Sequence, residues 1–290
     1  MNGARTIRRG GEEWPRALDL LADAPGFLRV RGAFLGEGDR AVSVVGSRAA
    51  GPEGIELARR IGRALARAGA WVVSGGAAGV DAAAHAGAVE GGGRTAVILG
   101  GGLDHLYPAA NRELFARVVE TGGGLAAEVE DGMRAASWSF PKRNRIVAAL
   151  GEATVVVRAG ARSGALVTAQ RAMRLGRPVW VAADGGPGES EGLRALGEAG
   201  ARTFRSVNEL VEALSLSAAG AVRREEARAA GLEGPAAAIW GALGGDPLPA
   251  DDVAHRAGVG AAQALSGLME LELLGLVERR PGRGFVRRAA

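Results

Sequence analysis

The stretch from Ser137 to Arg145 concentrates side chains that bind nucleic acid. Its nine residues hold three cations, one amide and two aromatic rings, and they include Lys142, the only lysine of the chain. Cations neutralise phosphates, and a ring offers a face on which a base stacks. The alternative is a charged helix terminus with Phe140 in the core. Against it, cations are unfavourable at a helix N-terminus unless an anion binds there, and Arg143 and Arg145 cannot share one helical face.

Glycine-rich loops follow several short apolar segments of the chain. Glycine lets backbone N–H groups approach a ligand, and a helix N-terminus adds partial positive charge, so such loops suit phosphate oxygens. The alternative is that each glycine only makes a tight turn between a strand and a helix. Together the loops favour an anion site where strands end. They are Gly46-Ser47-Arg48, Gly75 to Asp81, Gly100 to Asp104 and Ser163 to Thr168.

Nucleotide cofactor motifs are missing from these loops. Lys142 follows a proline and not a glycine, so there is no Walker A sequence, and Gly46, Gly51 and Gly54 do not fit the dinucleotide spacing. We therefore expect no cofactor.

Hydrolytic chemistry is also poorly supported. Asp104 and Glu128 are conceivable catalytic carboxylates, and His85 or His105 a partner. We expect Asp81 to cap its helix and His85 to be structural, and we do not expect an enzyme.

Composition limits the remaining classes of function. Of 290 residues, 47% are hydrophobic and 23% charged, enough for one large domain and a small one. Without cysteine there are no disulfides, thiolate metal sites or cysteine nucleophiles, and three histidines argue against a metal site. Residues 1–14 lack an apolar signal core, and no apolar run approaches the roughly 20 residues that span a bilayer, so we expect a soluble, cytoplasmic protein. The net charge of +4 favours nucleic acid only weakly.

Short apolar runs alternate with helical patterns between residues 41 and 214. Near-continuous apolar runs are typical of parallel strands that are buried on both faces, and the alternation predicts a doubly wound, mostly parallel α/β sheet. The expected strands are Val42–Val45, Trp71–Ser74, Thr95–Leu99, Leu125–Glu128, Thr154–Val157 and Val179–Ala182. The expected helices are Gly54–Ala68, Asp81–Glu90, Asn111–Glu120, Arg143–Leu150 and Ser163–Arg174.

The rest of the chain is expected to flank this Rossmann-like domain of residues 41–214. Residues 1–40 form a short N-terminal extension that packs on the core, and residues 215–234 form a linker. Residues 235–290 predict a winged helix: a helix at 236–243, a second helix capped by Asp251, a third at 261–274, and a two-stranded wing around Pro281–Gly284.

These features in order resemble the DNA-processing protein A (DprA/Smf) family, over about Trp14 to Thr203. The similarity rests on many spaced motifs and not on one glycine loop. They include Trp14-Pro15, Gly46-Ser47-Arg48, Ser74 to Asp81 with His85, Leu99 to Asp104 with Tyr107-Pro108 and Asn111, Glu128, Phe140 to Ile146, Ser163 to Ala169 and Ser190-Glu191-Gly192.

The resemblance implies a protein that binds single-stranded DNA in a basic pocket during natural transformation. Members of the family protect incoming strands, help load the RecA recombinase and act as homodimers. By position, the phosphate contacts would be Arg48, Lys142, Arg143 and Arg145, and Phe140 and Asn144 would shape the pocket. Backbone or hydroxyl donors would come from Gly46, Ser47, Gly75, Gly79, Ser163, Gly164 and Thr168.

Two positions depart from the family pattern. Arg158 stands where a glutamate is usual and offers a further DNA contact, and Ala183-Asp184 replaces a Pro-Gly pair. Both put the local shape of the pocket in doubt.

Two alternative functions remain open. A nucleotide phosphoribohydrolase of the lysine-decarboxylase-like type has a similar fold, but its catalytic glutamate is missing from Ser163 to Arg171. A transcription regulator would read duplex DNA with residues 261–274, which are poor in base-reading side chains and include Glu270 and Glu272.

Overall fold

The structure of the protein, a computed structural model, describes residues 3–161, 163–183, 190–214, 216, 231–232, 234–244, 247–280, 282 and 284–287. Most of the expected linker, and Asp184, lie outside these residues. The chain forms two compact units, of which the first ends at Val207 and the second begins at Asn208. The two units are described separately below.

The first unit is built on a sheet whose described strands number nine. In space their order is β1-β2-β6-β5-β4-β3-β7-β8-β9. Strands β3 to β9 pair in parallel, while β2 pairs antiparallel with both β1 and β6, which confirms the mostly parallel sheet. The strands are β1 (Arg5–Arg8), β2 (Phe27–Gly32), β3 (Ala41–Val45), β4 (Trp71–Ser74), β5 (Thr95–Leu99), β6 (Gly124–Ala127), β7 (Ala153–Val156), β8 (Val179–Ala182) and β9 (Arg202–Phe204).

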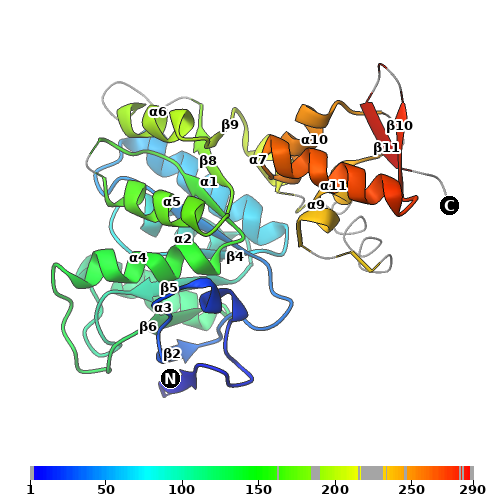
Figure 1. The fold of residues 1–290 in the computed structure, drawn as a ribbon. Helices are drawn as coiled ribbons and strands as arrows, with labels where there is room; N and C mark the ends of the chain where they lie inside the picture. The colour runs from blue at the N-terminus through cyan, green and yellow to red at the C-terminus, as the bar shows by residue number, and fades with distance from the viewer. Residues whose placement is uncertain are drawn as a thin grey trace. The chain divides into compact units, whose positions relative to one another are not determined.

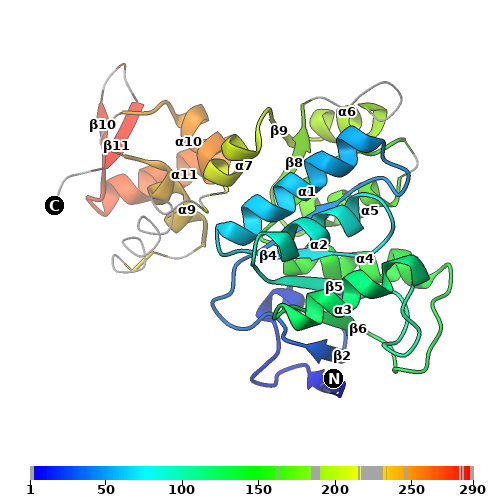
Figure 2. The ribbon, with the colours of Figure 1, turned by 180° about the vertical axis from the view of Figure 1, so that it is seen from behind.

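Helices cover both faces of this sheet, and for that reason its central strands are largely apolar, while the buried hydroxyls of Ser43, Ser74 and Thr95 donate to backbone carbonyl oxygens. Every residue of β3, β4 and β5 is buried. One face carries α4 (Ser139–Leu150), α5 (Gly164–Arg174) and α6 (Ser190–Glu198), which are in front in Figure 1. The other carries α1 (Pro52–Arg67), α2 (Val80–Glu90) and α3 (Arg112–Glu120), which are in front in Figure 2. Short 3₁₀ turns η1 (Arg16–Leu20) and η2 (Ala109–Asn111) lie in the connections.

The N-terminal extension does more than pack on the core, because β1 and β2 lengthen the sheet at one edge. These strands were not predicted, although Leu28 and Val30 alternate with Arg29 and Arg31 as in a strand with one buried face. Trp14 and Leu18 then turn inward to the core.

The order of the strands creates a crevice between β3 and β7. From β3 the chain moves through β4 and β5 to β6, and it then returns to place β7 on the other side of β3. Beyond the carboxyl ends of strands at such a reversal, neighbouring loops diverge and leave room for a ligand.

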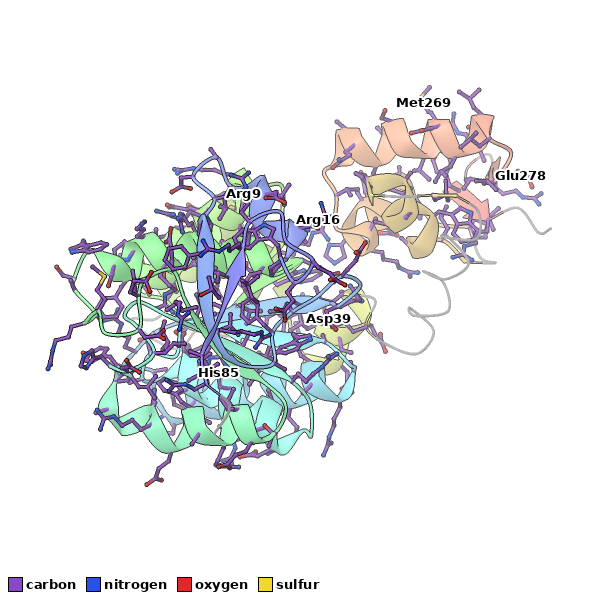
Figure 3. All side chains as sticks on the ribbon, turned by 90° about the horizontal axis from the view of Figure 1, so that it is seen from below. Arg9, Arg16, Asp39, His85, Met269 and Glu278 are labelled. Atoms are coloured by element: carbon purple, nitrogen blue, oxygen red, sulfur yellow. The ribbon has the colours of Figure 1, made fainter. Side chains whose placement is uncertain are left out.

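The second unit has three helices around an apolar core, and a two-stranded wing. Its elements after α7 (Val207–Ala213) are α9 (Gly234–Ala242), α10 (Ala250–Ala257), α11 (Ala261–Leu273), β10 (Val277–Arg280) and β11 (Gly284–Arg287). Ile239, Leu268 and Phe285 belong to its core, whereas Met269 points away from it (Figure 3). These three helices and two strands confirm the predicted winged helix. Asp251 does not cap α10, because Pro249 occupies that position and no side chain caps the helix.

The described part of the chain has no helix that is long and apolar enough to cross a membrane.

Candidate functional site

A pocket of about 630 Å³ lies where β3, β4 and β7 end, at the crevice described above. It brings together nine of the thirteen residues that the sequence indicated: Gly46, Ser47, Arg48, Gly75, Arg143, Asn144, Ser163, Gly164 and Thr168. The loops at the carboxyl ends of the strands supply Arg48 and the glycines, α4 supplies Arg143 and Asn144, and the start of α5 supplies Ser163, Gly164 and Thr168.

A second, smaller depression of about 80 Å³ adjoins the first. It shares Arg48, Gly75 and Arg143 with the large pocket and adds Phe140 and Tyr107. The Cζ atom of Arg48 lies 5.5 Å from the centre of the Phe140 ring, within the range of a cation–π contact. Arg48 therefore stands at the boundary between a polar pocket and an aromatic surface.

The N-terminus of α5 contributes positive potential to the large pocket. Ser163 is the N-cap, and its Oγ accepts a hydrogen bond of 3.2 Å from the backbone N–H of Ala165. Gly164, next in sequence, is exposed and lines the pocket. The partial positive charge at this end of the helix dipole favours an anion at this point.

Arg143 lies under the pocket as a fixed buried charge. Its Nη1 donates to the carbonyl oxygen of Ile98, and its Nε has no hydrogen-bond partner among the described residues. Burial lowers the pKa of Arg143 to about 10, against the opposing effect of the Asp81 carboxylate. The group stays charged at neutral pH and acts on a ligand through its field.

Asp81 forms part of the pocket wall, a role that sequence patterns did not reveal. It does not cap α2, because Gly79 occupies the N-cap position, and its Oδ2 instead accepts from the N–H of Ala77 at 3.3 Å. Burial raises the pKa of this carboxyl, while Arg143 and backbone hydrogen bonds oppose the rise.

Some predicted backbone donors are already used inside the protein. The N–H of Ser47 donates to the carbonyl oxygen of Arg158 at 2.8 Å, and the N–H of Gly75 bonds to Asp81. Gly79 does not line the pocket; a Cβ atom there would lie 2.7 Å from the carbonyl oxygen of Arg48. The structure therefore gives these glycines a role in close packing of the loops.

Lys142 and Arg145 converge on one carboxylate and line neither pocket. Glu128 Oε1 lies 2.6 Å from Nη2 of Arg145 and 3.4 Å from Nζ of Lys142. The Arg145 side chain is 3% exposed and also pairs with Asp23 at 2.7 Å, whereas Lys142 is exposed. That either residue contacts phosphate stays a prediction.

Arg158 lies outside the lining of both pockets. Its side chain is buried against the start of α1, where it packs on Gly54 and lies 3.8 Å from Glu53. The position of Arg158 therefore does not support the expected DNA contact.

His85 is a buried structural group, as expected. Its Nδ1 lies 2.7 Å from Oγ1 of Thr95, whose hydroxyl donates to the carbonyl oxygen of Val72. The hydroxyl proton is thus used, so Nδ1 must carry the imidazole proton. Burial, with a smaller effect of Arg143, lowers the pKa of His85 to about 3.

Models of known families match nearly the whole chain. The family described as DNA recombination-mediator protein A matches residues 5–215, and the DprA winged helix domain matches residues 223–283. The DprA protein of Mycobacterium tuberculosis is 40% identical, over 99% of this chain and 78% of its own length. Protein Smf of Escherichia coli is 33% identical, over 97% and 76%.

Two solved structures of the same family share the fold. DNA processing protein A of Streptococcus pneumoniae has a TM-score of 0.66 and 33% identity, over 71% of this chain and 73% of its own. The Helicobacter pylori protein, described for its single-stranded DNA binding mode, has a TM-score of 0.65 and 28% identity, over 73% and 95%. With its fold and both parts of its sequence matched, the chain belongs to the DprA/Smf family of DNA-processing proteins.

Proposed function

We propose that this chain binds single-stranded DNA at the pocket between β3 and β7, in the processing of DNA during natural transformation. The observation that carries the proposal is the position of Arg48. This side chain is exposed at the mouth of the pocket, lies over Phe140, and forms no ion pair within the described residues. Its charge is available to a phosphate.

The surroundings of Arg48 suit a nucleotide better than a free ion. A pocket of about 630 Å³ is as large as pockets that hold drug-sized ligands. Its polar side offers the first turn of α5 and the field of Arg143, while its other side leads to aromatic rings. Phosphate recognition with stacking predicts low sequence specificity and a preference for unpaired strands.

Membership of the family supports the wider role. We propose that the chain protects incoming strands, promotes loading of the RecA recombinase and acts as a homodimer in the cytoplasm, without catalysis. The relative whose single-stranded DNA binding mode is described, that of Helicobacter pylori, supports the choice of ligand. Two pockets in a dimer would engage one strand with increased avidity.

The test is a mobility-shift titration with a single strand and a duplex of equal length. We expect the single strand to bind at least tenfold more tightly, because only unpaired bases can enter the pocket or stack beside it. Equal or tighter binding of the duplex would contradict the proposal. Incubation with nucleoside monophosphates checks the hydrolase alternative, which requires release of free base.

A further inference from the structure

An exposed aromatic side chain, Tyr107, lies beside the site at Arg48. Tyr107 is 57% exposed and Trp138 is 56% exposed, and no other aromatic residue in the described part of the chain is classed as exposed. Scattered exposed apolar residues need no explanation. Tyr107, however, lies 5.7 Å from Phe140 between ring centres, and both rings line the depression beside Arg48.

The ring of Phe140 is held in a fixed position. A Cβ atom at Gly100 would lie 3.0 Å from its Cδ1, so the backbone of the loop after β5 supports it closely. The loop that carries Tyr107 is held too, because Nδ2 of Asn111 donates to the carbonyl oxygens of Gly76 at 2.9 Å and Ala77 at 3.3 Å. Tyr107 and Phe140 thus form an aromatic ledge beside Arg48.

The size of the depression indicates how a base would use the ledge. At about 80 Å³ it is too small to enclose a base, whereas a flat ring can lie on an exposed aromatic face. Arg48 borders this depression and the large pocket, so a phosphate at Arg48 joins a nucleotide in the pocket to a neighbour over the ledge.

We propose that the aromatic ledge is a second nucleotide subsite, in which the base next to the pocket stacks on Tyr107 and Phe140. This inference rests on the proposed binding of single-stranded DNA at the large pocket. It implies that the strand leaves the pocket across Arg48 towards η2 and the start of α4.

The first test compares Tyr107→Ala and Tyr107→Phe in the full chain, on a thymidine strand and on an abasic strand of equal length. Loss of stacking should weaken binding of the thymidine strand by roughly 5- to 100-fold in Tyr107→Ala, while Tyr107→Phe stays within about twofold of wild type. On the abasic strand, which keeps the phosphates, wild type and Tyr107→Ala should bind alike. Leu20→Ala, an exposed apolar residue outside both pockets, is the matched control.

The second test uses the fluorescence of Trp138. Trp14, Trp71 and Trp180 are buried and Trp240 is partly buried, so quenching by the thymidine strand that is absent in Trp138→Phe would report a base close to the start of α4. Tight binding by the wild type with no effect of Tyr107→Ala and no quenching would overturn the ledge alone. If the wild type binds neither strand, both the ledge and the proposed function fall.

Discussion

The guanidinium of Arg143 lies directly behind the backbone of Gly75: a Cβ atom at position 75 would be 2.5 Å from Cζ of Arg143 and would collide with Nη1. Position 75 requires glycine, because the side chain of Arg143 extends from α4 across the loop after β4 to donate to the carbonyl oxygen of Ile98. Gly75 and Arg143, which are 68 positions apart in sequence, therefore pack together in the wall of the large pocket.

The first prediction is that Gly75→Ala destabilises the protein and weakens its binding of single-stranded DNA. The added methyl group must displace Arg143, and overpacking of this kind costs about 1–3 kcal/mol. Urea unfolding measures the loss. Gly164→Ala is the matched control, because it lines the same pocket but its Cβ would meet nothing within 4 Å. Equal stability of the two variants would refute the contact.

The second prediction separates the two cations that share Glu128. Arg145→Ala removes a nearly buried partner and leaves Glu128 with only the longer contact to Lys142, so it should cost roughly 3 kcal/mol in the free energy of unfolding. Lys142→Ala removes an exposed partner and should cost less than about 1 kcal/mol. Urea denaturation compares them. A larger loss for Lys142→Ala would mean that Arg145 does not anchor α4.

The third prediction concerns the salt dependence of DNA binding. If Arg48 holds one phosphate, Arg48→Ala should weaken binding and reduce the slope of log affinity against log salt by about 0.7. Titrations of a homopolymer and a mixed strand should show the same change, because phosphates carry no sequence information. Arg16→Ala, an exposed arginine on η1 labelled in Figure 3, controls for net charge. An unchanged slope in Arg48→Ala would place the site elsewhere.

The fourth prediction is a loss of stability in weak acid that depends on His85. The folded-state pKa of about 3 lies below the ordinary value of 6.5, so the unfolded chain binds a proton that the folded chain rejects. The contribution of His85 to the free energy of unfolding is fully present above pH 6.5. It decreases as the pH falls towards 3, by up to about 1.4 kcal/mol per pH unit.

The test of this dependence is His85→Asn, whose amide can still donate to Thr95 but does not titrate. Between pH 6.5 and 5, most carboxylates remain ionised, so the difference in slope between wild type and variant isolates the histidine. Parallel curves for the two proteins would show that His85 does not titrate as described.

The sequence by itself determined the arrangement of the parallel core. Trp71–Ser74, Thr95–Leu99 and Val179–Ala182 were predicted to the residue, because strands buried on both faces are near-continuous apolar runs. The carboxyl ends of β3, β4 and β7 then set where Arg48, Gly75 and Ser163 would meet. The antiparallel strands β1 and β2 do not have this pattern: in β2, Leu28 and Val30 alternate with Arg29 and Arg31.

Only the tertiary structure decided what each cation of the Phe140–Arg145 segment does. Lys142, Arg143 and Arg145 look alike in sequence, yet one is exposed, one lies under the pocket behind Gly75, and one is held by Asp23 and Glu128. Successive residues of a helix point in different directions, and the groups that each side chain meets come from distant parts of the chain. The role of a charge is set by its burial and its partners, and a linear sequence specifies neither until the chain has folded.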